Sequence, residues 1–184
     1  MFKLNARELR ECDEADVKGQ MVDQKRNPIY LILENVYDTY NVGGLFRLAD
    51  ALKAEKIYLC GQTEIPPNSK IKKASIGTYK IVPWTYCKTT KEAIDELRQI
   101  SNFQFPISIV AVEQSPKSVP YTQANYSSPV ALIVGNETYG VLPETLELVD
   151  QIVEIPMWGI NKSLNVIVSA AIVSYWVMNK CMIK

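Results

Sequence analysis

Two uninterrupted apolar runs constrain the fold of this chain more than any other feature of its sequence. Ile29 to Leu33 reads IYLIL and Val130 to Val134 reads VALIV, with no charged residue in either run. A strand with one face in water alternates apolar and polar residues, whereas a continuous run indicates a strand covered on both faces. Such strands are typical of parallel sheets that lie between two layers of helices.

The rest of the chain alternates between strand and helix patterns. Further strands are predicted at Lys56–Leu59, Ile107–Val112 and Gln151–Ile155, with a short one within Tyr79–Val82 of the otherwise irregular stretch Gly61–Tyr86. Helices are predicted near the N-terminus and at Gly44–Ala54, Thr89–Ile100, Pro143–Val149 and Ser163–Asn179. The alternation predicts an α/β fold with a mostly parallel sheet and helices on both faces.

The length of 184 residues suits one domain with a sizeable core. No repeat or long linker divides the chain, so we expect a single domain over residues 1–184, with residues 1–27 as a short helical extension and 28–184 as the core. The longest apolar stretch, Val166 to Met178, is too short to span a bilayer, and the first residues lack the apolar core of a signal peptide. We therefore expect a cytoplasmic protein without a membrane partner.

Cysteine and histidine usage limits the chemistry. The chain has no histidine, and its four cysteines (Cys12, Cys60, Cys87 and Cys181) form no Cys-x-x-Cys pair, so no metal site is predicted. Catalysis by a histidine base is excluded. Any proton transfer must use a carboxylate, a lysine, a tyrosine, an arginine or water.

Positive charge is concentrated in one segment although the formal net charge is zero. The stretch Gly61–Lys91 holds a single acid, Glu64, and six lysines: Lys70, Lys72, Lys73, Lys80, Lys88 and Lys91. The segment is either a solvated loop or an electrostatic footprint for phosphates. The sequence alone leaves both interpretations open.

The first unusual loop, Tyr40 to Arg47, follows the IYLIL strand. Gly43 and Gly44 at a helix start would let the backbone approach a ligand, and free N–H groups there favour anions. Arg47 lies among apolar residues and needs a partner, which is either a carboxylate in a structural salt bridge or a phosphate.

Two more polar loops follow predicted strands. Gly135–Gly140 fits neither G-x-G-x-x-G nor the P-loop, and its acid, Glu137, could orient Arg47, hold a substrate hydroxyl or cap a turn. In the loop after the last strand, Ser163 is a candidate N-cap, whereas Asn165 in the first turn has no such routine role. Open α/β sheets bind ligands at the carboxyl ends of their strands, where all three loops are expected.

The last helix carries two apolar stripes. One consists of Leu164, Ile167, Val168, Ala171, Ile172 and Tyr175, and the other of Val166, Ala170, Val173 and Val177. A helix that is apolar all round must be buried all round. We expect its second face to pack on another copy in a homodimer, and the alternative is that the N-terminal segment covers it.

Together the three loops resemble the signature motifs of the SpoU-type, or TrmH-like, branch of the SPOUT RNA methyltransferases. The segment N-V-G-G-L-F-R-L-A-D is similar to the first motif, I-V-G-N-E-T-Y-G to the second and I-P-M-W-G-I-N-K-S-L-N-V to the third. Lys73 to Thr78, followed by Val82-Pro83, also resembles the central segment of the family. The likeness extends from about Pro28 to the C-terminus.

The resemblance implies a C-terminal deep trefoil knot and a homodimer formed through the last helix. It also implies S-adenosylmethionine as the cofactor, with S-adenosylhomocysteine as the product and no metal. By motif position, the cofactor contacts would come from Val112, Gly135, Ile155, Met157, Ser163 and Leu164.

The reaction that the resemblance implies is methyl transfer to a ribose 2′-hydroxyl of transfer or ribosomal RNA. Arg47 would assist deprotonation of that hydroxyl, with Asn41, Glu137, Ser163 and Asn165 positioning Arg47 and the ribose. RNA would be bound by Arg47, Lys70, Lys72, Lys73, Lys80 and Lys162. The first 26 residues hold six basic and six acidic residues, unlike the basic extensions of many relatives, so RNA docking would rest on Gly61–Lys91.

Three other functions are compatible with the sequence. The chain could be a base methyltransferase on the same fold, although Arg47 favours ribose. It could be a non-catalytic dimer that binds the cofactor or RNA, or an unrelated nucleotide-binding α/β protein.

Overall fold

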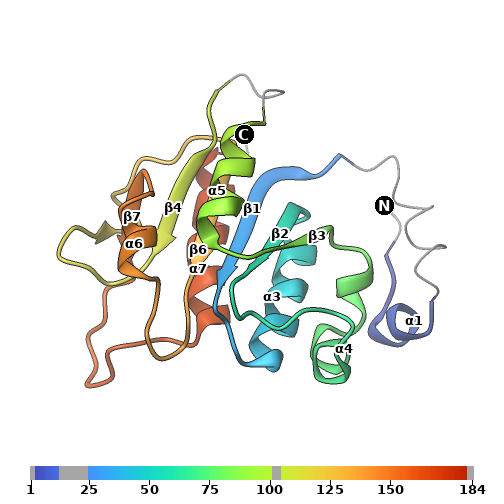
Figure 1. Ribbon diagram of the computed structural model, residues 1–184. Coiled ribbons are helices and arrows are strands. Elements are labelled where there is room, and N and C mark those ends of the chain that lie inside the picture. Colours follow the sequence, from blue (N-terminus) through green and yellow to red (C-terminus); the bar gives the residue numbers. More distant parts are fainter. Residues whose placement is uncertain (1–2, 13–24, 101–104, 182–184) are drawn as a thin grey trace.

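The computed structural model describes residues 3–12, 25–100 and 105–181 (Figure 1). Its centre is a seven-stranded sheet with the order β3-β2-β1-β6-β4-β7-β5, in which every pairing is parallel. The strands are β1 (Asn27–Glu34), β2 (Ala54–Cys60), β3 (Trp84–Cys87), β4 (Ser108–Val112), β5 (Val119–Pro120), β6 (Val130–Val134) and β7 (Gln151–Glu154). The predicted parallel α/β architecture is confirmed.

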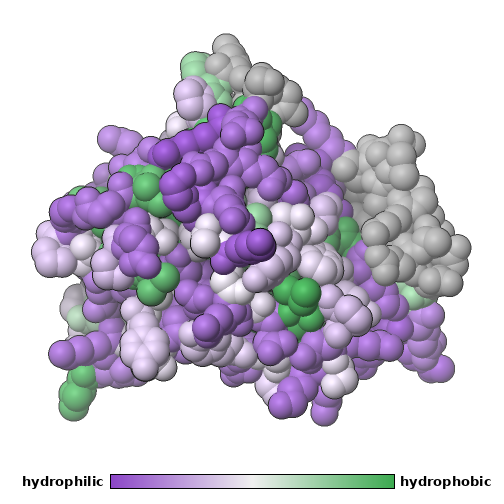
Figure 2. Space-filling model, viewed as in Figure 1, coloured by the Kyte–Doolittle hydropathy of each residue, from purple (hydrophilic) through white to green (hydrophobic). Residues whose placement is uncertain are grey.

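Helices cover both faces of the sheet. They are α1 (Ala6–Glu11), α3 (Thr39–Ala51), α4 (Ser69–Ser75), α5 (Thr90–Arg98), α6 (Pro143–Leu146) and α7 (Val166–Cys181), with a 3-10 helix, η1 (Thr78–Lys80). In β1, Leu31 and Leu33 belong to the core shared with α3 and α7, whereas Tyr30 and Ile32 belong to the core shared with α5. The alternation explains why the IYLIL run has no polar position. The face that carries α5 and α6 is hydrophilic over most of its outer surface, with small separate apolar spots (Figure 2).

The direction of strand addition reverses between β1 and β6. The chain adds β2 and β3 on one side of β1, and β6, β4, β7 and β5 lie on the other side. Ligand crevices in open α/β sheets form at such a switch point, outside the carboxyl ends of the strands. The loops after β1, β4, β6 and β7 meet there.

Helix α3 begins five residues earlier than predicted. The Asp38 carboxylate accepts a hydrogen bond from the Tyr40 N–H at 2.8 Å and caps the helix. The residues that were expected to form a loop, Tyr40–Arg47, therefore form the first turns of α3. A Cβ at Gly43 would lie 2.5 Å from the Ala74 Cβ of α4, and one at Gly44 would lie 2.3 Å from the Ile167 Cδ1 of α7. The two glycines thus allow α4 and α7 to pack closely on α3, and the interpretation of a glycine-rich ligand loop is wrong.

The stretch Gly61–Tyr86 is more regular than predicted. The Asn68 side chain accepts from the Lys70 N–H at 2.9 Å and caps α4, a helix that the sequence analysis missed. The predicted strand within 79–82 is wrong, because η1 occupies that position and the strand follows at β3. The Lys80 Nζ donates to the main-chain carbonyls of Arg10 (3.3 Å) and Cys12 (2.8 Å), which ties the predicted N-terminal helix, α1, to η1.

Two predicted helices begin later than expected. Helix α5 begins at Thr90, because Thr89 is its N-cap: the Thr89 Oγ1 accepts from the Glu92 N–H at 3.2 Å, and the Glu92 carboxylate accepts from the Lys88 N–H. Helix α7 begins at Val166, and Asn165 rather than Ser163 caps it, because Asn165 Oδ1 accepts from the Ile167 N–H at 2.9 Å.

Helix α7 buries one of its two apolar stripes. Val166, Ala170, Val173 and Val177 pack into the core, whereas Val168 is 44% and Tyr175 54% exposed. The alternative is that the N-terminal segment covers the exposed stripe. Residues 13–24 of that segment lie outside the described part, while α1 lies beside α4 (Figure 1). None of the helices in the described ranges has both the length and the hydrophobicity needed to cross a bilayer.

Candidate active site

A chain of three hydrogen-bonded side chains lies at the carboxyl edge of the sheet. It joins three polar segments, which are Tyr40–Arg47 (the first), Gly135–Gly140 (the second) and Ile155–Asn165 (the third). Asn41 Nδ2 donates to Glu137 Oε1 at 2.9 Å, and Asn165 Nδ2 donates to Asn41 Oδ1 at 3.0 Å. Asn41 is buried, and Glu137 Oε1 also accepts from the Asp38 N–H at 3.3 Å. The fold thus brings together residues that lie 96 and 124 positions apart in sequence.

The donor-to-acceptor direction of these hydrogen bonds is fixed at both ends of the series. An ionised Glu137 can only accept hydrogen bonds, so Asn41 must present its amide nitrogen to it and its oxygen to Asn165. At the other end, Asn165 Oδ1 accepts from the Ile167 N–H, which turns the Asn165 nitrogen towards Asn41. The cap of α7 and the carboxylate of the second segment therefore orient the buried amide between them.

Asn41→Asp should destabilise the fold by about 1–3 kcal/mol at neutral pH, because a buried donor is replaced by a second carboxylate beside Glu137. The two carboxylates would repel each other at short range, and this repulsion weakens as protons bind. The stability deficit should therefore be larger at high pH than at low pH. Urea unfolding at pH 5 and pH 8 measures this dependence.

Asn125→Asp is the matched control for that experiment, because it adds the same charge at an exposed loop position. Equal pH dependence in the two variants would show that Asn41 and Glu137 do not interact as described.

The second segment is a rigid turn organised by Asn136, which the sequence analysis did not single out. Its Oδ1 accepts from the N–H groups of Thr138 (2.8 Å) and Tyr139 (3.0 Å), and its Nδ2 donates to the carbonyl of Asn35 at the end of β1 (2.9 Å). An asparagine directly after a glycine at a strand end is a recognisable signal for such a side-chain-capped turn. The turn aims Glu137 at Asn41.

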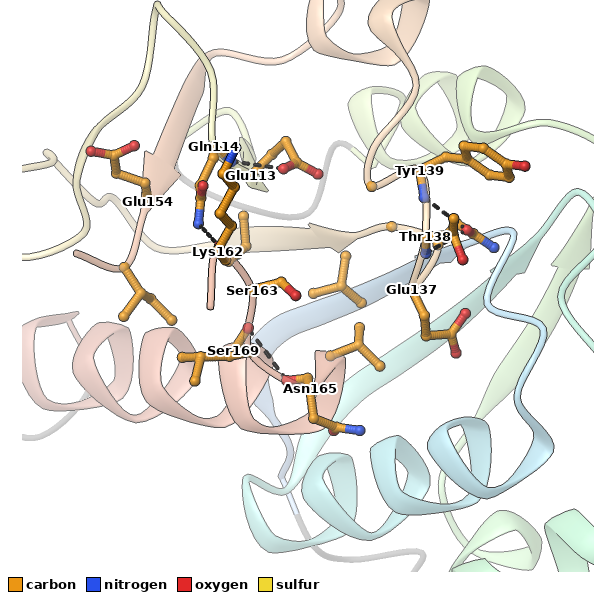
Figure 3. Close-up of a pocket in the computed structure, with 18 of the residues that line it drawn as sticks. Glu113, Gln114, Glu137, Thr138, Tyr139, Glu154, Lys162, Ser163, Asn165 and Ser169 are labelled. Carbon is orange, nitrogen blue, oxygen red and sulfur yellow. Dashed lines mark hydrogen bonds between the residues drawn. The ribbon is translucent and has the colours of Figure 1, made fainter. Parts of the chain in front are cut away.

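A pocket of about 590 Å³ lies beside this turn (Figure 3). Main chain and side chains from the ends of β4, β6 and β7 and the start of α7 line it. All six residues predicted to contact a cofactor are on its wall, namely Val112, Gly135, Ile155, Met157, Ser163 and Leu164. Glu137, Lys162 and Asn165 also line the pocket.

Glu113 and Gln114 are pocket residues that the sequence analysis missed. Glu113 Oε2 accepts from the Val141 N–H at 2.8 Å and occupies the space that a side chain at position 140 would need, since a Cβ there would lie 2.0 Å from this oxygen. Gln114 Nε2 donates to the Lys162 carbonyl at 2.5 Å, so it ties the end of β4 to the third segment. A polar pair directly after the apolar strand β4 was the available signal.

Carboxylates outnumber cations on the pocket wall. Glu113, Glu137 and Glu154 line it together with a single lysine, Lys162. Figure 3 shows Glu113, Gln114, Lys162 and Glu154 on one side of the pocket, Glu137 on the other, and Asn165 at the start of α7. The net negative charge of the wall therefore favours a ligand that carries a positive charge into the pocket.

Arg47 lies outside this pocket. It is exposed on α3, and among the described residues it makes no hydrogen bond or ion pair, so the structural salt bridge considered from the sequence is not present there. The lysines proposed to contact RNA differ in their positions. Lys72 and Lys73 are exposed on α4, and Lys70 lines a second cavity. The Lys80 ammonium donates to main-chain carbonyls at the end of α1.

Cys60, Cys87 and Cys181 offer no reactive thiol near the pocket. Burial raises the pKa of the Cys60 and Cys87 thiols, which face each other on β2 and β3, and burial also raises the pKa of Cys181. None of the three lines the pocket. Among the described residues, no group of three or more His, Cys, Asp or Glu side chains is arranged to hold a metal ion.

Comparison with known proteins places the chain in a family. The sequence profile of the family described as SpoU rRNA Methylase matches residues 28–175. The tRNA (guanosine(18)-2′-O)-methyltransferase of Aquifex aeolicus is 29% identical over 162 residues, which is 85% of this chain and 71% of that protein. The 23S rRNA (guanosine-2′-O-)-methyltransferase of Haemophilus influenzae is 29% identical over 163 residues, 89% of this chain and 64% of that protein.

A solved structure shares the fold. The AdoMet-bound rRNA methyltransferase from Sinorhizobium meliloti superposes with a TM-score of 0.76 at 26% identity, and the match covers 94% of this chain and 60% of that one. The profile match extends over most of the chain and includes all three polar segments that meet at the pocket. The chain therefore belongs to the SpoU rRNA methylase family.

Proposed function

We propose that the protein is an S-adenosylmethionine-dependent RNA methyltransferase that methylates a ribose 2′-hydroxyl in transfer or ribosomal RNA. The observation that carries the proposal is the hydrogen-bonded chain of Glu137, Asn41 and Asn165 at the edge of a pocket lined by all six expected cofactor contacts. The names of the relatives, which describe 2′-O-methylation of guanosine in tRNA and 23S rRNA, support the reaction type.

The pocket fits S-adenosylmethionine in size and in chemistry. Its volume of about 590 Å³ lies within the range of about 300–1,000 Å³ typical of small-ligand sites. Main-chain groups beside Gly135, Ile155 and Leu164 can bond an adenosine, and the surplus of carboxylates suits a sulfonium cation. When bound, this cofactor supplies an electrophilic methyl group and leaves as S-adenosylhomocysteine.

The side chains around the pocket would prepare the ribose. Glu137 Oε1 is used by Asn41 and Asp38, which leaves Oε2 as an acceptor for a ribose hydroxyl. Ser163 lies on the pocket wall and could hold a neighbouring sugar oxygen. In this proposal, Glu137, Asn41, Asn165 and Ser163 position the ribose.

Arg47 would then help the hydroxyl to lose its proton. It is the only cationic residue of α3, the helix that also carries Asn41, and its exposed guanidinium can pair with a phosphate of the incoming RNA. Because the chain has no histidine, the proton of the hydroxyl would pass to an oxygen of that phosphate or to water and not to an imidazole. Lys70, Lys72, Lys73 and Lys162 would contact the RNA backbone.

The exposed stripe of α7 supports a homodimer. Val168 and Tyr175 present apolar surface beside the half-buried Ile172, which a second copy of the helix would cover. We extend the proposal to the trefoil knot of the SPOUT fold, to a single domain over residues 1–184, and to the cytoplasm as the place where the RNA is met. Sedimentation velocity would measure the mass and so test the homodimer. An experimental density map would trace residues 130–181 and so test the knot, and cell fractionation would test the location.

The first experiment is methyl transfer from labelled S-adenosylmethionine into RNA from a strain that lacks this gene. The RNA is digested, and its nucleosides are separated beside 2′-O-methyl standards. Label in one 2′-O-methylnucleoside supports the proposal and names the base. Label in a base-methylated nucleoside would keep the fold and refute the ribose assignment.

Two other outcomes separate the remaining alternatives. Tight S-adenosylhomocysteine binding without transfer to any RNA would favour a non-catalytic binding protein. Displacement of S-adenosylhomocysteine by ATP would favour a general nucleotide-binding protein.

A further inference from the structure

A second cavity of about 540 Å³ lies next to the proposed active site. One wall is the start of α3 with the residues before it, and the other is the segment that leads into α4. The two cavities are neighbours, because Asp38 lines the second one while its N–H donates to Glu137 on the wall of the first. We call it the tyrosine groove, and it is lined by Tyr37, Asp38, Thr39, Tyr40, Glu64, Asn68, Ser69 and Lys70.

Two exposed aromatic rings distinguish this groove. Tyr37 is 46% and Tyr40 52% exposed, and both lie on its wall. Their backbone is held in place, because Asp38 between them caps α3 by accepting from the Tyr40 N–H at 2.8 Å. Aromatic rings on a fixed backbone beside a cavity form a stacking surface for the flat face of a nucleobase.

The charges of the groove favour a base over a phosphate. Its two carboxylates, Asp38 and Glu64, would repel a phosphate, whereas they can accept hydrogen bonds from the amino and imino groups of a base. Among the described residues, the Glu64 side chain makes no hydrogen bond and is exposed. Lys70 at the rim, with Lys72 and Lys73 further along α4, provides cations for the backbone outside the groove.

We propose that the tyrosine groove holds one unstacked base of the RNA substrate, stacked on Tyr37 and Tyr40, while the attached backbone passes over Lys70. Binding there would hold the RNA beside the pocket that Glu137 lines, so the groove contributes to affinity and not to the chemical step. This inference rests on the proposed function, since it assigns part of the substrate recognition of the same enzyme.

The test compares a Tyr37→Ala/Tyr40→Ala variant with the wild-type protein in two assays. The first is binding of a single-stranded ribo-oligonucleotide that contains 2-aminopurine, whose fluorescence changes on stacking. The second is methyl transfer into total tRNA and rRNA from the deletion strain. We expect oligonucleotide binding to weaken by about tenfold or more, and the KM for RNA to rise similarly with kcat nearly unchanged.

Matched variants separate stacking from folding. Tyr37→Phe/Tyr40→Phe keeps both rings and should retain the wild-type values, and Tyr37→Leu/Tyr40→Leu keeps side-chain volume without a flat ring and should behave like the alanine variant. Phe105→Ala removes an equally exposed aromatic residue from the opposite edge of the sheet and should change neither assay. S-adenosylhomocysteine affinity should be the same in all of them.

The groove proposal and the proposed function fail in different ways. Wild-type levels of oligonucleotide binding and KM in the alanine and leucine variants would overturn the groove while leaving the methyltransferase intact. A wild-type protein that methylates no RNA would overturn the function, and the oligonucleotide assay would still decide whether the tyrosines stack on bases.

Discussion

Arg47→Ala should lower the rate of methyl transfer to RNA by about 10²–10⁴-fold, the range that assistance to proton transfer contributes in enzymes. The structure places this residue on the helix that carries Asn41 but outside the pocket proposed to bind the cofactor. Loss of its guanidinium should therefore leave S-adenosylhomocysteine binding and thermal stability near their wild-type values. Single-turnover transfer and isothermal titration calorimetry measure the two effects separately.

Arg98→Ala is the matched control for Arg47→Ala. Arg98 is also an exposed arginine on a helix, but it pairs with Asp150 at 3.6 Å and donates to the Leu148 carbonyl on the other side of the sheet. Arg47→Lys adds information, because a lysine keeps the charge but not the two-pronged geometry for a phosphate. If Arg47→Ala transferred methyl groups at the wild-type rate, the proposed role of this residue would be wrong.

Gly135→Ala should weaken S-adenosylhomocysteine binding and destabilise the protein. A Cβ at position 135 would lie 2.2 Å from the Gly140 carbonyl carbon and 2.3 Å from the Val141 nitrogen, and these are main-chain atoms that no rotamer change can move. The turn would have to open, at a cost of about 1–3 kcal/mol typical of overpacking. Because its main chain lines the pocket, S-adenosylhomocysteine affinity should fall by about 5–150-fold.

Gly159→Ala is the control for this effect. It adds the same methyl group in the third polar segment, where a Cβ would meet no atom within 4 Å. Calorimetry and urea unfolding of both variants should show a large change for position 135 and almost none for position 159. Equal behaviour would mean that the turn between β6 and α6 adapts freely and does not shape the pocket.

The sheet could be predicted from the sequence because its central strands are buried on both faces. The IYLIL and VALIV runs have a single physical explanation, and the intervening helices follow from their apolar periodicity and caps. The same reasoning failed where tertiary packing decides. Two consecutive glycines ordinarily indicate a turn, but Gly43 and Gly44 lie inside α3 because α4 and α7 pack against them.

Polar segments were harder to predict for a related reason. Helix α4 has one fully buried apolar residue, Ile71, among lysines, so it has almost no periodic signal. Ser163 and Asn165 are both good caps, and the choice between them depends on Asn41, which lies far away in sequence. The motifs pointed to Asn41, Glu137 and Asn165, which meet, and also to Arg47, which lies apart from them. Only the fold gives the direction of the hydrogen bonds that run from Asn165 through Asn41 to Glu137.

The hydrogen-bonded chain of Glu137, Asn41 and Asn165 also has a consequence for protein synthesis. Its members become available one after another as the polypeptide leaves the ribosome, and the last of them precedes the final helix. A polypeptide that ends before Asn165 has no partner for the side-chain oxygen of Asn41. It also lacks the wall of the pocket that residues 155–165 form. A nascent chain therefore cannot complete this pocket early, and ligand binding in it becomes a test of whether folding has reached the C-terminal helix.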